Sequence, residues 1–117
     1  MIVPKTEKGK DKNAEISMKY AARSTQYQGS MMIDICDLEL IGTTLEQGEL
    51  LVRLTKEYYQ QEVIEDAAAQ NLLLKCEIAN LVGDRIVKQA IDMKLAKEIS
   101  IKRIANVPFL MIFKFRH

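Results

Sequence analysis

The sequence predicts an α+β domain, in which a mixed or antiparallel sheet of about five strands carries two main helices packed on one face. Three observations lead to this fold class. Apolar and polar residues alternate in three segments before residue 55, as they do in half-buried strands. Beyond Glu65 the apolar spacing changes to steps of three and four, which is typical of helices. The alternation then returns near the C-terminus.

Residues 1–13 are predicted to form an extended basic tail, and residues 14–117 a single domain. Residues 4–13 contain no large apolar side chain, so burial cannot offset the entropy that is lost when this segment becomes ordered. The chain has 117 residues, of which 48% are apolar, and this composition fits one domain rather than two.

The first three strands are predicted from alternation within short segments. One strand is expected over 15–21 and a second over 31–36, because apolar residues occupy every other position in both segments. The segment 24–30 between them contains Gly29 and is predicted to be a hairpin loop. A third strand with the same alternation is expected over 50–54.

Two helices are expected after the third strand. The first is predicted from apolar residues at helical spacing, namely Ala67, Ala68, Leu72 and Leu73. The second is predicted from a longer stripe of apolar residues in steps of four and three, formed by Ile78, Val82, Ile86, Ala90 and Met93. Gly83 interrupts this stripe at a cost of ~1 kcal/mol relative to alanine, which indicates a close approach to the backbone there.

Two further strands are expected near the C-terminus. Alternation at Ile99, Ile101 and Arg103 indicates the first of them. Alternation over 109–115 indicates the second, and Pro108 stands where proline is tolerated because a strand begins there.

Charge is segregated along the chain, although the formal net charge is only +1. Residues 1–30 carry a net charge of +3, residues 31–80 carry −7, and residues 81–117 carry +5. This asymmetry indicates that one surface meets a polyanion while another stays solvated, unless the fold interleaves the segments and cancels their fields.

The sequence offers no cysteine and histidine pattern for a zinc site. Cys36 and Cys76 lie far apart without a CxxC pair, and His117 is the only histidine. We therefore expect no metal, no cofactor and two buried free thiols, with a disulfide between them as the alternative. The longest apolar runs, such as Phe109–Phe113, fall far short of the ~20 residues of a membrane span, which predicts a cytoplasmic protein that is neither spanning nor secreted.

Basic residues at the two ends of the chain are the candidate RNA-binding residues. The tail lysines have the spacing of a segment that neutralises phosphates one by one, and they are Lys5, Lys8, Lys10 and Lys12. Further basic residues extend this footprint if the first and last strands are neighbours, and they are Lys19, Arg23, Lys102, Arg103, Lys114 and Arg116. The alternative is a solvated terminus without a partner.

Two short segments carry a family resemblance. They run from Cys36 to Gly42, with Asp37 and Glu39 between them, and from Ile78 to Gly83, with Asn80 between them. Further elements in the same order are Gly48, Tyr58-Tyr59 and Val107-Pro108. Over about residues 15–115 the sequence resembles the archaeal family called domain of unknown function 424. The resemblance implies an α+β domain in the cytoplasm of an archaeon and an association with translation.

One departure from that family bears on chemistry. The family segment around Pro108 usually reads Gly-Val-Pro-His, whereas this chain has Asn106, Val107, Pro108 and Phe109. Any reaction that the family runs through that histidine is absent here.

The family motifs have a structural reading and a functional one. The functional reading of the first motif is a thiol nucleophile, Cys36, with Asp37 or Glu39 as its base. Neighbouring carboxylates raise the pKa of a thiol, which opposes this reading. We therefore prefer a structural turn, in which Asp37 bonds to local backbone and Gly42 adopts a special dihedral. Asn80 is expected to cap the second helix rather than bind a ligand. The aromatic residues are expected mostly in the core rather than stacked on bases.

These observations predict a non-enzymatic ribosomal or ribosome-associated protein that binds the rRNA backbone through its basic tail and C-terminal strand. Its partners would be rRNA and neighbouring ribosomal proteins, with no membrane, no small-molecule substrate and no homo-oligomer. The alternative is a small ligand-binding or enzymatic domain with a pocket near Asp37, Glu39 and Asn80. A protein interaction module that uses an apolar edge strand is a third alternative.

Overall fold

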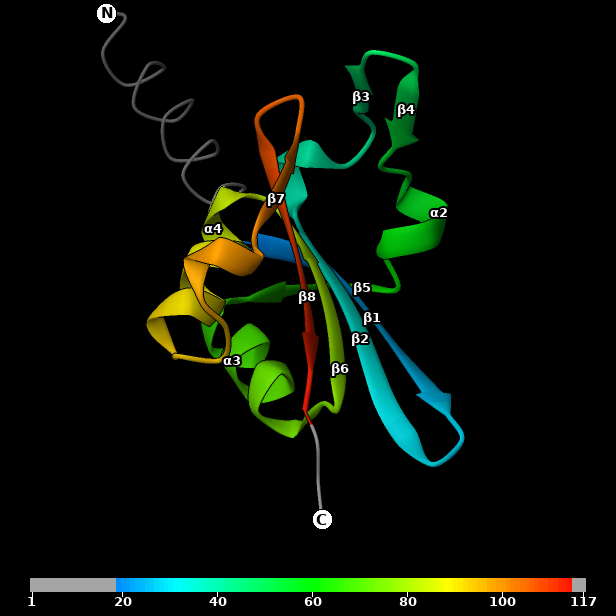
Figure 1. The fold of residues 1–117 in the computed structure, drawn as a ribbon. Coiled ribbons are helices and arrows are strands. Elements are labelled where there is room, and N and C mark those ends of the chain that lie inside the picture. Colours follow the sequence, from blue (N-terminus) through cyan, green and yellow to red (C-terminus); the bar gives the residue numbers. More distant parts are fainter. Residues whose placement is uncertain (1–18, 115–117) are drawn as a thin grey trace, which may run out of the picture.

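The computed structural model describes residues 19–114 and shows an α+β domain (Figure 1). The predicted tail, residues 1–13, lies outside the described residues, as do its four lysines and Arg116. Eight strands and three α-helices are described, together with two short 3-10 helices. Within the described residues, no helix is long and apolar enough to cross a membrane.

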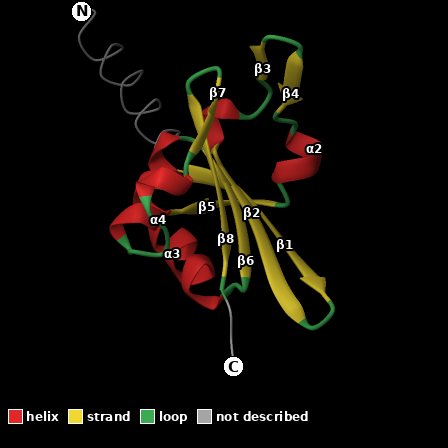
Figure 2. Cartoon of the chain, viewed as in Figure 1, coloured by secondary structure: helices red, strands yellow, loops and turns green. Residues whose placement is uncertain are grey.

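The elements follow one another along the chain with short connections (Figure 2). Their order is β1 (Lys19–Tyr27), β2 (Ser30–Asp37), η1 (Leu38–Leu40), β3 (Thr44–Gln47), β4 (Leu50–Arg53), α2 (Lys56–Tyr59), β5 (Glu62–Glu65), α3 (Asp66–Lys75), β6 (Ile78–Val82), α4 (Asp84–Asp92), η2 (Glu98–Ser100), β7 (Lys102–Ile104) and β8 (Val107–Phe113).

The main sheet has six strands in the order β5-β1-β2-β6-β8-β7, one more than the sequence indicated. Strands β2 and β6 are parallel, and every other neighbouring pair is antiparallel, so the sheet is mixed. Strand β5 was not expected from the sequence because its four residues, Glu62–Glu65, hold only one buried side chain. Strands β1 and β8 are separated by β2 and β6.

The β1–β2 hairpin is tighter than the predicted loop over 24–30. Pairing continues to Tyr27 and Ser30, and only Gln28 and Gly29 form the turn. Both turn residues have positive φ, 52° and 82°, which is the backbone of a type I′ turn. The right-handed twist of two paired strands favours this turn, so the strands extend further than alternation alone suggested.

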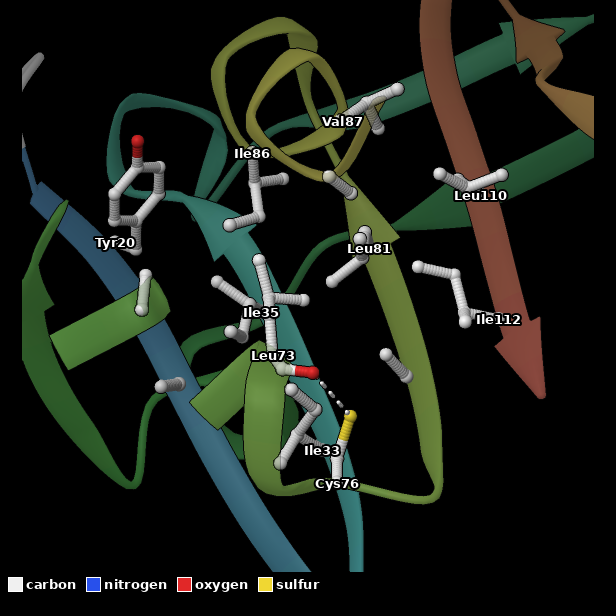
Figure 3. Packing of buried hydrophobic residues seen from close by; sticks show 14 of the residues in the cluster. Tyr20, Ile33, Ile35, Leu73, Cys76, Leu81, Ile86, Val87, Leu110 and Ile112 are labelled. Carbon is white, nitrogen blue, oxygen red and sulfur yellow. Dashed lines mark hydrogen bonds between the residues drawn. The ribbon is translucent and has the colours of Figure 1, made fainter. Parts of the chain in front are cut away.

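Helices α3 and α4 cover one face of the main sheet and bury the larger core (Figures 1 and 3). Ile33 and Ile35 from β2 lie against Leu73 of α3 and Ile86 of α4, and Figure 3 shows these side chains gathered between the sheet and the two helices. All four are fully buried. Burial of one such side chain stabilises a fold by about 1.5–3 kcal/mol, so this layer holds the helices on the sheet.

A smaller layer covers part of the other face of the sheet. It consists of α2 and the separate β3–β4 hairpin, which lie on the side opposite to α3 and α4 (Figure 1). Leu45 and Leu54 pack there against Cys36 and Val82. The predicted third strand therefore exists as β4, but it pairs with β3 in this hairpin and lies outside the main sheet.

The expected helix from Ile78 to Met93 is wrong in its first part. Residues Ile78–Val82 form strand β6, and helix α4 begins only at Asp84. A spacing of four residues is compatible with both structures, because i and i+4 share one face of a helix and also one face of a strand. Asn80 consequently lies inside a strand and does not cap a helix.

The expected strand at Ile99, Ile101 and Arg103 is also displaced. Glu98–Ser100 form a 3-10 turn, and strand β7 covers Lys102–Ile104. Ile99 is 91% exposed, so the alternation there does not reflect burial. Strand β8 begins with Val107 and Pro108, as the position of the proline indicated.

Candidate functional site

The described basic residues do not form one continuous surface. The extended footprint required the first and last strands to be neighbours, and they are not, because β2 and β6 lie between β1 and β8. Lys19 is the first residue of β1. Nη1 of Arg103 lies 3.9 Å from Oδ1 of Asp84, the first residue of α4. Arg23 and Lys102 extend from the face opposite to α3 and α4, which we call the outer face.

Lys114 is engaged in the fold. Its Nζ donates a hydrogen bond to the carbonyl of Leu73 and another, 3.1 Å long, to the carbonyl of Leu74. Both carbonyls belong to the last turn of α3, where a helix lacks partners for its oxygens and where a cation is favoured. Lys114 therefore caps α3, and its proposed contact with phosphate competes with this role.

Asp37 binds the first amides of helix α4. Its Oδ2 accepts a hydrogen bond from the Arg85 amide at 2.9 Å, and its Oδ1 accepts one from the Ile86 amide at 3.0 Å. The expected bond to local backbone is wrong, because these amides lie 48 and 49 residues away in sequence. Burial raises the pKa of Asp37 to about 6, against the opposing effect of Arg85 and the two amides.

Arg85 connects several segments at this corner, and the sequence did not single it out. Its guanidinium binds Glu39 through Nε at 3.1 Å and also through Nη2. Nη2 also donates to the carbonyl of Lys19 at 2.9 Å, and the guanidinium carbon lies 4.7 Å from the centre of the Tyr20 ring. Asp37 and Glu39 therefore serve to attach α4 to the sheet.

The remaining family-motif residues have structural partners. Gly42 has φ of +92°, as a special dihedral requires, and its amide donates to the Leu54 carbonyl at 2.7 Å. Gly83 donates its amide to the carbonyl of buried Pro108 at 3.0 Å. Cys36 is buried, and burial together with Asp37 and Glu39 raises the pKa of its thiol to about 12. The two carboxylates shift the thiol pKa in the direction that the sequence predicted, and burial contributes more than they do.

The outer face contains a buried carboxylate, Asp34, which is 2% exposed. Two neutral groups donate to its Oδ1: the Tyr58 hydroxyl at 3.4 Å and the Asn80 amide at 3.3 Å. These bonds are long for hydrogen bonds to an ionised acceptor, which usually measure 2.7–2.9 Å from nitrogen. Burial raises the pKa of Asp34, while the bonds from Asn80 and Tyr58 and the charge of Arg23 act in the opposite direction.

A pocket of about 420 Å³ opens beside Asp34. Its polar lining includes Asp34, Asn80 and Lys102, and its apolar lining includes Phe109 and Met111. Tyr58 and Tyr59 from α2 also line it, with ring centres 4.7 Å apart in an edge-to-face arrangement. Helix α2 thus forms one wall over the sheet, and a volume of this size is within the range of ligand sites.

The side chains of the outer face form rows across the strands. Strand register aligns Arg23, Asp34, Asn80 and Met111 in one row from β1 to β8. The next row, toward the end that α2 and the β3–β4 hairpin do not cover, includes Ile78 opposite Phe113. Phe113 and Met111 are each 55% exposed, and Tyr58 is 45% exposed.

The expectation that the aromatic residues lie mostly in the core holds in part: Tyr20 lies in the larger core, and Tyr59 and Phe109 pack against the smaller one, whereas Tyr58 and Phe113 are exposed. Among the described aromatic side chains, Tyr20 alone is buried. Alternation predicted that Phe109 and Phe113 share one face of a strand, but it could not show that this face is covered at Phe109 and open at Phe113. Arg23 stacks on Tyr58, with its guanidinium carbon 5.0 Å from the ring centre.

The predicted pocket near Asp37, Glu39 and Asn80 does not form. Strand alternation and register direct Asp37 toward α4 and Asn80 toward the outer face, so the sheet separates them. Sequence reasoning missed Asp34 and Tyr58 as site residues. The available signal was a charged residue, Asp34, inside an otherwise apolar strand segment. In the described part of the chain, no group of three or more histidine, cysteine, aspartate or glutamate residues could hold a metal ion.

Comparisons with known proteins agree with this architecture. A crystal structure of an uncharacterized conserved protein from Methanopyrus kandleri resembles the chain with a TM-score of 0.71 and 19% sequence identity, over 85% of this chain and 96% of that one. At this identity the likeness concerns the fold. No curated protein matches the chain. The family model described as "Protein of unknown function (DUF424)" matches residues 25–115, and the chain therefore belongs to this family.

Proposed function

We propose that this protein is a non-enzymatic, ribosome-associated RNA-binding protein that holds single-stranded RNA on the outer face of its sheet. The observation that carries this proposal is the exposure of Phe113 and Met111 on that face, between Arg23 on one side and Lys102 on the other. Aromatic side chains on an open sheet stack on unpaired bases, and nearby cations bind the phosphates that join them.

The arrangement of Tyr58 supports the same partner. Its ring is 45% exposed and lies under the guanidinium of Arg23, so the aromatic surface and the positive charge are adjacent. Base stacking contributes about 1–3 kcal/mol per base, which makes two or three rings sufficient for measurable binding. The proposal transfers the RNA contact from Lys114, which follows β8, to side chains of the outer face.

Association with the ribosome rests on the charge of the chain. The two ends of the sequence carry net charges of +3 and +5, and the tail lysines that dominate the first lie outside the described residues. Basic terminal segments of this kind contact phosphates without reading sequence. The exposed carboxylates of the acidic middle, such as Glu57 and Glu62, would face solvent or a basic neighbouring protein.

Binding of a labelled single-stranded RNA, followed by fluorescence anisotropy at several salt concentrations, tests the RNA proposal. Phe113→Ala is expected to weaken binding by roughly 5-fold or more, because one stacked base is lost. Lys102→Gln is expected to reduce the slope of log K against log salt by about 0.7, the value for one phosphate of a single strand. Lys88→Gln is the matched control, because Lys88 is an exposed lysine of α4 on the opposite side of the sheet.

Two results would overturn the proposal. One is the absence of binding to any single-stranded RNA at low salt, and the other is equal binding by wild type and Phe113→Ala. The ribosome part is tested by sedimentation of the native protein from cell lysate. Co-migration with ribosomal subunits at low salt supports it, and a free monomer at every salt concentration contradicts it.

A further inference from the structure

We propose that the pocket beside Asp34 receives a guanine base. This inference rests on the proposed RNA-binding function and names the base that the outer face selects. Stacking on Phe113 alone would accept every base, because every base has a π-face. A pocket whose lining includes polar groups would instead distinguish one base from another.

Asp34 is the group that the fold alone does not explain. A buried carboxylate normally has a cation or several short hydrogen bonds, because burial of an unpaired charge is costly. Among the described residues no cation forms an ion pair with Asp34, since the Arg23 guanidinium lies over Tyr58 and donates to the Tyr58 carbonyl. The two bonds from Tyr58 and Asn80 both end on Oδ1.

The acceptors at this position determine which base fits. Oδ2 of Asp34 and the side-chain oxygen of Asn80 are acceptors that the two described bonds do not use. Guanine has two adjacent donors on its pairing edge, N1–H and the N2 amino group. Adenine, cytosine and uracil each place an acceptor next to a donor there. Asp34 and Asn80 both line the pocket, so the acceptors that they present there suit the two donors of guanine best.

The walls of the pocket suit a planar base. Tyr59, Phe109 and Met111 supply apolar surface, and the volume of about 420 Å³ accommodates a purine. Burial raises the pKa of Tyr59 to about 12, so this phenol stays neutral beside the base. Lys102 also lines the pocket, where its ammonium group can bind the O6 atom or a phosphate of the same nucleotide.

A purely structural role of Asp34 makes a different prediction. If Asp34 served only the fold, Asp34→Asn would change stability without altering any preference among bases. If Asp34 selects guanine, Asp34→Asn removes the preference, because an amide hydrogen now faces the N1–H donor. The variant would at the same time keep or gain stability, because no charge is buried. Thermal denaturation of Asp34→Asn measures this second effect.

The experiment compares three labelled RNA octamers: all uridine, the same strand with one central guanosine, and the same strand with inosine at that position. Wild type is expected to bind the guanosine strand at least about 10-fold more tightly than the uridine strand, with inosine between them because it lacks the N2 amino group. Asp34→Asn is expected to bind the guanosine and uridine strands alike. Lys88→Gln, on α4, is expected to retain the full preference.

The experiment also distinguishes a free nucleotide from a base within RNA, and it tests the guanine pocket separately from RNA binding. If free GMP displaces the guanosine strand at a concentration near the dissociation constant of that strand, the ligand is a free nucleotide. If GMP displaces the strand only weakly, the ligand is guanosine within RNA. Equal binding of the guanosine and uridine strands by wild type overturns the guanine pocket and leaves RNA binding intact. Binding of GMP without binding of any strand overturns the RNA function and supports the pocket. No binding of either overturns both.

Discussion

Gly83 and Asp37 are in such close contact that a side chain at position 83 would have to displace Asp37. A Cβ on Gly83 would lie 2.4 Å from both Cγ and Oδ2 of Asp37, and 2.8 Å from its Cβ. Gly83 also has φ of +118°, a conformation that side chains rarely adopt. The close approach indicated by the sequence is therefore real, and the approaching group is the carboxylate that binds the first amides of α4.

Gly83→Ala is expected to lower the free energy of unfolding by roughly 3 kcal/mol or more, because backbone strain and displacement of Asp37 add together. Urea denaturation measures this change. Gly48→Ala is the matched control: its φ is +61° and nothing lies within 4 Å of the added Cβ, so a cost of about 1 kcal/mol is expected. Equal effects of the two substitutions would show that the Asp37 contact is unimportant.

Asp37 is expected to make stability depend on pH. Burial raises its pKa from 3.8 to about 6 in the folded protein, so between these values the folded state binds more protons than the unfolded state. The contribution of Asp37 to stability is therefore greatest below about pH 4 and is lost as the pH rises to about 6. The free energy of unfolding decreases by at most about 3 kcal/mol over this range.

The measurement for Asp37 is the difference in free energy of unfolding between wild type and Asp37→Asn at pH 4, 5, 6 and 7. Because other carboxylates titrate in both proteins, the difference isolates position 37. The free energy of unfolding of wild type minus that of Asp37→Asn is expected to fall from pH 4 to pH 6 and to stay level at higher pH. A difference that rises over this range would mean that the amides and Arg85 hold the pKa below its usual value.

Both thiols are expected to be unreactive in the folded protein. Cys36 and Cys76 are fully buried, and burial raises the pKa of the Cys36 thiol to about 12, so almost no Cys36 thiolate is present at pH 8. A colorimetric disulfide reagent should find no thiol in the native protein and both thiols after denaturation. Rapid reaction of one thiol in the native protein would contradict the described burial.

Lys114→Met is expected to reduce stability by about 1 kcal/mol, because the last carbonyls of α3 lose their donor and their favourable charge. Methionine keeps the apolar stem of the side chain. Lys88→Met serves as a control, because Lys88 forms only an exposed ion pair with Asp92. Denaturation and RNA binding are measured on the same samples. Weaker RNA binding with unchanged stability would return Lys114 to the set of phosphate contacts.

Sequence patterns were most informative where structure depends on near neighbours. The β1–β2 hairpin followed from alternation on both sides of Gly29, and the start of β8 followed from Pro108. The raised pKa of Cys36 was expected from its adjacent carboxylates, although burial, which the sequence alone does not show, is the larger cause. The same local reasoning failed for Ile78–Val82, because steps of four residues suit both a strand and a helix.

The sequence by itself determined the α+β class, most of the strands, the family and the segregation of charge. Only the tertiary structure decided which side chains meet: Asp37 with the amides of α4, Lys114 with the end of α3, and Asp34 with Asn80 and Tyr58. The physical reason is that hydrophobic periodicity describes which face of one element is buried. Strand order, by contrast, results from packing both faces of the whole sheet, and it brings residues dozens of positions apart into contact.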